Sequence, residues 1–119
     1  MQRWDLKEMA TPGGSRSPIV LESEESAARA VLIGLEPGQA LGDHEVKENA
    51  FVFVVDGVVE VDAGGESSQA EAGTLLRFEP QERHAVSSNS GAKLLLLLAP
   101  WPGPGHYRGG GERAAQAAR

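Results

Sequence analysis

The chain has 119 residues, a formal net charge of −6, 40% hydrophobic residues, 5% aromatic residues and no cysteine. This length suits a single domain, and the scarcity of aromatic side chains means that its core must consist mainly of Val and Leu. The acidic balance argues against binding to nucleic acid or to an anionic membrane, because such binding depends on Lys and Arg. The lack of cysteine excludes disulfides and thiolate chemistry, and it agrees with a reducing compartment.

Two local features bear on cellular location. No apolar run follows the first five residues, so the sequence predicts no signal peptide. The longest apolar stretch, Leu94 to Ala99, is far shorter than the ~20 residues that a membrane-spanning helix needs. We therefore expect a soluble cytoplasmic protein.

The first forty residues predict short extended segments between loops. Gly and Pro interrupt every longer pattern, as is typical of turns. The expected elements are a short strand or turn over 4–9, a loop over 11–17, an edge strand over 18–21, an acidic turn over 22–28, and a strand over 30–35 that ends before Pro37-Gly38.

Residues 51–62 predict a β-hairpin. Two runs rich in Val flank Asp56-Gly57, a dipeptide typical of tight hairpin turns because it tolerates positive φ. After this dipeptide polar and apolar residues alternate, which predicts one buried and one solvated face. No polar residue occurs over 51–55, so both faces of that run are expected to be covered.

The remainder of the chain predicts further short strands. They are expected near 67–70, 74–78, 84–87 and 93–98, with turns at Gly64-Gly65, 72–73, 80–83 and 88–91. Eight to ten closely spaced strands indicate an all-β sandwich or barrel. We divide the chain into N-terminal strands and loop (1–29), a barrel core (30–99) and a tail rich in Pro and Gly (100–119).

The chain has three histidines, and two of them follow a glycine at informative spacings. The pattern from Gly38 through His44 to Gly57 resembles the first cupin motif, G-x5-H-x-H-x3-E-x6-G, and Gly73 with His84 resembles the second, G-x5-P-x-G-x2-H-x3-N. The resemblance covers about residues 30–99. It implies the cupin fold, a double-stranded β-helix also called a jelly-roll barrel. Departures from the two motifs fall at Val46, Ala50, Glu79, Gln81 and Ser88, although Pro80 and Asn89 lie one residue from the expected Pro and Asn.

The resemblance implies a metal site of three histidines and one glutamate, of which this chain keeps His44 and His84. Val46 replaces the second histidine, and Ala50 replaces the glutamate. Protein sites for Fe, Mn, Ni or Zn usually supply three or four ligands. We therefore expect either no metal or a weakly held divalent ion, for which Glu48 is a possible substitute ligand. His106 is a second possible addition, if the tail closes over the barrel.

The residues around these histidines also predict a pocket. Four even-numbered positions that alternate in step with His44 are apolar: Val46, Ala50, Val52 and Val54. One interpretation is that they line an apolar cavity containing His44 and His84. The other interpretation is that the valines are simply barrel core. Either histidine can instead be a hydrogen-bonded structural residue. The residues on the opposite face of this strand are Phe51, Phe53 and Val55. We expect them either to form a homodimer face, as the resemblance implies, or to pack beneath the N-terminal strands. Trp101 is expected to cap the barrel end.

Three functions follow from these features, and no catalytic residue is assigned. The first is binding of a small molecule in the apolar pocket. The alternative is a metal-dependent dioxygenase or isomerase that uses His44 and His84 with substitute ligands. The third is acid–base catalysis without metal, which needs a cation in the pocket, and Arg77 is the candidate on a barrel strand.

Overall fold

Short antiparallel strands dominate the fold. The computed structural model describes residues 1–11, 19–21, 28–44 and 49–100. Within these ranges no helix is long and apolar enough to cross a membrane. The strands are β1 (Ile19–Val20), β2 (Arg29–Leu35), β3 (Ala40–His44), β4 (Asn49–Ala63), β5 (Glu66–Glu71), β6 (Leu75–Phe78), β7 (His84–Ser87) and β8 (Ala92–Ala99).

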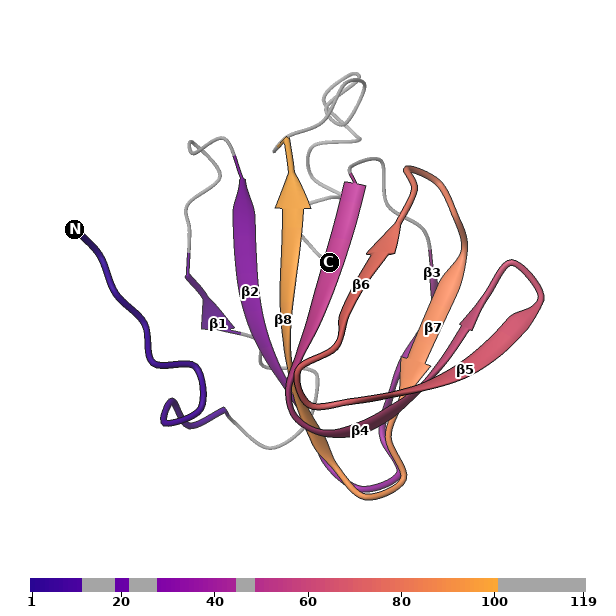
Figure 1. The fold of residues 1–119 in the computed structure, drawn as a ribbon, viewed down its shortest axis with the longest axis horizontal. Coiled ribbons are helices and arrows are strands. Elements are labelled where there is room, and N and C mark those ends of the chain that lie inside the picture. The colour runs from indigo at the N-terminus through magenta and orange to yellow at the C-terminus, as the bar shows by residue number, and fades with distance from the viewer. Residues whose placement is uncertain (12–18, 22–27, 45–48, 101–119) are drawn as a thin grey trace.

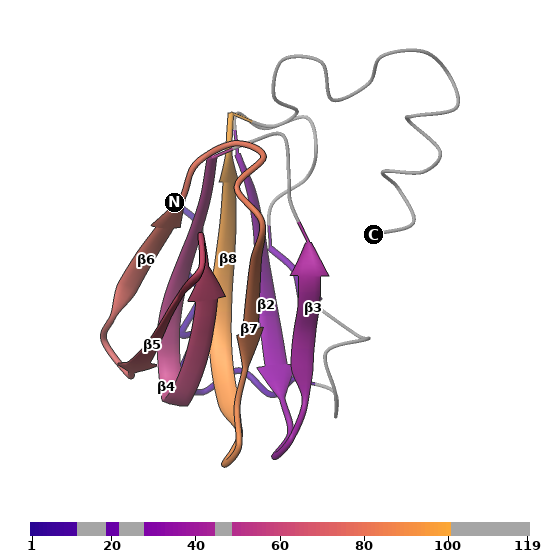
Figure 2. The same cartoon turned by 90° about the vertical axis from the view of Figure 1, so that its right-hand side faces the viewer.

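These strands form one curled sheet. The order is β1-β2-β8-β4-β7-β3, and β5 and β6 each pair with β4. Figure 1 shows the sheet curling so that β2 and β8 lie on one side and β5 and β7 on the other, and Figure 2 shows β6 and β3 at opposite edges. The all-β class that the sequence predicts is confirmed, and the predicted strands over 18–21, 30–35, 67–70, 74–78, 84–87 and 93–98 all have counterparts.

The predicted hairpin at Asp56-Gly57 is wrong, because β4 continues through this dipeptide without a chain reversal. The first half of β4 pairs with β8 and β6, and the second half pairs with β5 and β7. Gly57 does adopt a positive φ of 86°, but Gln81 is the one non-glycine residue with positive φ among those described, so Asp56 lacks the φ that the turn requires. The pairing with β8 shifts register between Val54 and Asp56, so this glycine serves a β-bulge that bends the strand.

The predicted turn at Gly64-Gly65 is confirmed, and it joins β4 and β5 in a hairpin. Ala63 pairs with Glu66, which leaves a two-residue loop, and both glycines have positive φ, 58° and 81°. That geometry matches the preferred two-residue turn. The predicted alternation over 58–62 is confirmed, because Val59 and Val61 are buried while Asp62 is exposed.

β3 is a strand that the sequence pattern does not indicate. Its sequence, Ala-Leu-Gly-Asp-His, contains Gly and Asp, which are depleted in strands. It forms through antiparallel pairing with β7. Tertiary pairing therefore overrides weak local propensity here.

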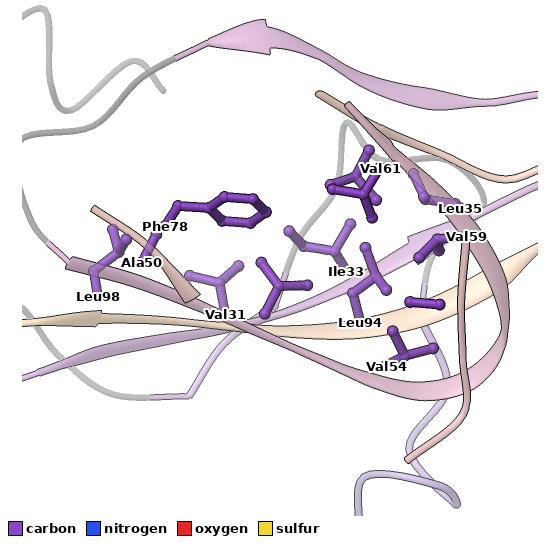
Figure 3. Packing of buried hydrophobic residues seen from close by; sticks show 13 residues of the cluster. Val31, Ile33, Leu35, Ala50, Val54, Val59, Val61, Phe78, Leu94 and Leu98 are labelled. Atoms are coloured by element: carbon purple, nitrogen blue, oxygen red, sulfur yellow. The ribbon is translucent and has the colours of Figure 1, made fainter. Parts of the chain in front are cut away.

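The inner face of the curl is an aliphatic core, as composition predicts. Register places Ile33, Leu94 and Val54 side by side on β2, β8 and β4, and all three are buried. Figure 3 shows the cluster running from Ala50, Leu98 and Phe78 at one end to Leu35, Val59 and Val61 at the other. Burying each such aliphatic side chain contributes about 1.5–3 kcal/mol.

Candidate ligand-binding site

His84 begins β7 and faces the inside of the curl. The side chains at His84 and Val86 are buried while Ala85 and Ser87 are half-buried, so the histidine shares the face of the core valine. Only 3% of His84 is exposed. Its ring stacks on that of Phe78, the last residue of β6, with centroids 4.0 Å apart and planes 5° from parallel. This end of the inner face therefore carries a buried imidazole beside an aromatic wall.

The loop between β6 and β7 fixes the orientation of this imidazole. Nδ1 of His84 lies 3.0 Å from the carbonyl oxygen of Glu82. A carbonyl only accepts, so Nδ1 of His84 carries a proton in this contact. Glu82 is itself held by two bonds, since its amide donates to the carbonyl of Glu79 and its carboxylate accepts from the amide of Glu79. Gln81 completes the loop with a φ of 67°.

His44 is placed opposite His84 by strand pairing. The backbone register of β3 and β7 makes the two residues direct partners. On the other side of β7, Ala63 of β4 is the partner of His84. The structure thus brings together, at the level of the backbone, the two histidines that the sequence singles out.

Ala50 lies in the core at the same end of the sheet. It pairs with Leu98 on one side and with Phe78 on the other, and it is 1% exposed. A methyl group offers no ligand to a metal ion. The position where the family pattern has glutamate therefore carries an apolar side chain with apolar strand partners.

The described residues do not complete a metal site. Among them, no group of three or more His, Cys, Asp or Glu side chains is close enough to hold an ion. Two imidazoles alone fall short of the three or four ligands that Zn and related ions usually take from proteins. Within the described part of the chain, the residues therefore do not make up the full metal centre that the resemblance implies.

The remaining predicted site residues divide into two groups. Val52 and Val54 belong to the buried aliphatic cluster, so they are barrel core, and a further role in lining a ligand pocket stays a prediction. Other predicted residues lie outside the described ranges, and nothing is concluded about them: Val46, Glu48, Trp101 and His106.

Arg77 does not serve the inner face. It pairs with Phe51, one residue before the inward-facing Phe78. Its half-exposed guanidinium forms a salt bridge to Glu79 at 3.1 Å and donates to Asn49 at 2.9 Å. The acid–base hypothesis therefore loses its candidate cation, because alternation along β6 turns this side chain outward.

Ser88 has a structural role that the sequence did not lead us to expect. Its hydroxyl donates to the carbonyl of Val58 at 2.6 Å and accepts from the amide of Gly91 at 2.9 Å. Its backbone also bonds Gly38 and Gln39. The sequence indicated this role only through its position: Ser88 occupies the asparagine position of the second motif. A short polar side chain there closes the turn.

A family model described as a cupin domain matches residues 31–100, which is more than half of the chain. Among curated proteins, no match to the sequence is found. Several solved structures resemble the fold. A conserved protein of unknown function from Streptococcus pyogenes is 19% identical, with a TM-score of 0.68, over 82% of this chain and 86% of the other.

Two further structures extend this likeness. A cupin superfamily protein from Desulfitobacterium hafniense is 11% identical, with a TM-score of 0.71, over 79% of this chain and 85% of its own. A predicted oxalate decarboxylase from Thermotoga maritima is 20% identical, with a TM-score of 0.64, over 70% of this chain and 79% of its own. At these identities the likeness concerns the fold alone.

Proposed function

Because this chain belongs to the cupin family, we propose that it binds a small molecule at the His84 end of the inner face. The observation that carries the proposal is a buried imidazole, stacked on Phe78 and oriented by a backbone carbonyl. Ligand sites are typically apolar concavities with a few oriented polar groups. His44 and His84 supply those groups, and Ala50 with Phe78 supplies apolar surface.

The chemistry of this end favours a compact apolar molecule with a hydroxyl group. The hydroxyl donates to an imidazole nitrogen of the His44–His84 pair, and the hydrocarbon body packs on Phe78 and Ala50. A hydrogen bond of this kind contributes about 0.5–1.5 kcal/mol, which corresponds to roughly a two- to tenfold gain in affinity.

Cyclohexanol and methoxycyclohexane form a matched pair of probes, because only the alcohol donates a hydrogen bond. We expect cyclohexanol to shift the backbone amides of Ala50, Ala63 and His84 in ¹⁵N–¹H spectra and to bind about threefold tighter than the ether. The double substitution His44→Phe with His84→Phe should abolish this difference, and Arg77→Gln, on the outer face, should leave it intact. Equal affinities for both probes, or no shifts up to the solubility of the alcohol, would refute the proposal.

A metal-dependent dioxygenase or isomerase is the second candidate function. The direct pairing of His44 with His84 supports it, because both residues fall at ligand positions of the family motif. Further ligands must then come from outside the described residues, with Glu48 as the candidate. Elemental mass spectrometry of untagged protein tests this. Near-stoichiometric Fe, Mn, Ni or Zn that is lost in His44→Ala supports it, and metal content near zero after supplementation rules it out.

We also propose a cytoplasmic homodimer that associates through the outer face around Phe51 of β4 and Leu75 of β6. Phe51 is half-buried there, while Leu75 is 62% exposed. Exposed apolar patches of this kind commonly mark interfaces. A monomer mass by light scattering at micromolar concentration would contradict the dimer.

A further inference from the structure

A single turn near the N-terminus packs against the outer face of the sheet. The amides of Glu8 and Met9 both donate to the carbonyl of Asp5, at 3.2 and 3.0 Å. The Asp5 carboxylate accepts from the amide of Glu8 at 3.3 Å. Residues 5–9 thus form a closed turn whose first residue caps it, and the carboxylate of that residue is engaged with the backbone.

Lys93 holds this turn on β8. Its ammonium donates to three carbonyl oxygens, those of Leu6 at 3.0 Å, Lys7 at 2.9 Å and Met9 at 2.6 Å. An ammonium has three donors, so these bonds use all of them. Lys93 precedes the inward-facing Leu94, which places it on the outer face. One side chain from the barrel therefore fixes the position of the N-terminal segment.

A cavity of about 550 Å³ lies between this segment and the sheet. Its volume falls within the roughly 300–1,000 Å³ typical of small-molecule sites. The barrel contributes Phe53 and Val55, which have the opposite parity to the core residues Val52 and Val54. The cavity is therefore separate from the inner face. The remaining lining residues are Arg3, Trp4, Asp5, Leu6, Lys7, Ala72 and Gly73.

The lining combines aromatic surface with cations. Trp4 is 37% exposed and faces the same cavity as Phe53, so a planar ring can lie against aromatic walls. Arg3 and Lys7 bring two positive charges in a chain whose net charge is −6. Within the described residues neither of these cations forms a salt bridge. The one acidic lining residue, Asp5, already accepts a backbone hydrogen bond.

We propose that this outer cavity is a second binding site, selective for a planar aromatic carboxylate. The ring packs against Trp4 and Phe53, and the carboxylate is paired by Arg3 and Lys7. Lys93 is a positioning residue, because it holds the N-terminal turn that forms one wall and is not itself part of the lining.

The test uses the full chain with 2-naphthoate and its neutral analogue 2-naphthalenemethanol as probes. We expect 2-naphthoate to shift the indole Nε1–H signal of Trp4, assigned with a Trp101→Phe variant, and the amide of Gly73. It should leave the amide of Val86 unmoved. The anion should bind about threefold or more tightly than the alcohol, since exposed ion pairs contribute modestly. The double variant Arg3→Gln with Lys7→Gln should remove this preference.

Two further variants separate the site from general effects. Arg77→Gln removes one cation from the same outer face but outside the cavity, and binding should be unchanged. Lys93→Met should abolish measurable binding while the amides of β2 and β4 keep their shifts. If that variant fails to fold, the Arg3/Lys7 variant still decides the matter.

Three results would overturn the proposal. One is equal affinity for the anion and the alcohol. Another is a set of shifts centred on His84 and Val86. The last is absence of binding together with a Trp4 signal that depends on protein concentration, because a second copy of the chain would then cover this face.

Discussion

Replacing Gly57 by alanine tests the role assigned to the bulge in β4. The residue has a φ of 86°, and a β-carbon built there would lie 2.8 Å from the Cα of Ala92 and even closer to the carbonyl oxygen of Gly91. Both neighbours are backbone atoms, one in the residue before β8 and one in its first residue, so neither can rotate away. Gly64 is the matched control, because it also has positive φ but would leave an added β-carbon in open space.

The two substitutions should differ in cost. A left-handed backbone conformation costs an alanine about 1–2 kcal/mol of stability. Alanine also lowers the conformational entropy of the unfolded chain, which offsets about 0.4–1 kcal/mol of this cost. Gly64→Ala should therefore destabilise by about 1 kcal/mol. Gly57→Ala adds steric overlap with backbone, which typically costs about 1–3 kcal/mol, so its total should be about 2–4 kcal/mol.

Urea unfolding followed by circular dichroism measures both free energies of unfolding, provided that the slopes with denaturant agree among the variants. Equal costs for Gly57→Ala and Gly64→Ala would refute the reasoning. That result would mean that Gly57 occupies an open turn, as the hairpin prediction required, and not a bulge in contact with β8.

Two other substitutions test a side-chain hydrogen bond and a backbone conformation near the site. Ser88→Ala should destabilise by about 1–3 kcal/mol, because it removes a hydrogen-bond partner from the partly buried Val58 carbonyl and Gly91 amide. A Ser87→Ala control should stay within about 0.5 kcal/mol, and equal effects in urea unfolding would contradict the role of the Ser88 hydroxyl. Gln81→Gly should be neutral or stabilising by up to about 1 kcal/mol, because glycine adopts the φ of 67° without strain, and a thermal midpoint lowered by several degrees would count against this explanation.

Much of the fold could be predicted because its strands follow simple patterns. β8 is a run of leucines and β2 is a run of aliphatic residues, so each was placed within one residue of its bounds. A hairpin was wrongly predicted at Asp56-Gly57 because this dipeptide carries a turn signal similar to that of Gly64-Gly65. Long-range pairing of β4 with β8 decided between them, and no local pattern encodes that pairing.

The candidate site was predictable only in part. The glycine-to-histidine spacings singled out His44 and His84, and the backbone register pairs these two residues across β3 and β7. Their place in a ligand pocket stays a prediction. The stack of His84 on Phe78 was not foreseen, because it depends on how the loop over 79–83 returns the chain. The side of the sheet on which Arg77 lies was also undetermined, since a four-residue strand gives too little alternation to fix its parity.

The binding proposal is tested most directly by the imidazole nitrogens themselves. Long-range ¹H–¹⁵N spectra of the histidine side chains resolve the individual rings. We expect His84 to be protonated at Nδ1, as the Glu82 carbonyl requires, and cyclohexanol to shift a nitrogen of His44 or His84. Binding of cyclohexanol that leaves both rings unchanged would contradict a small-molecule site at this end of the barrel.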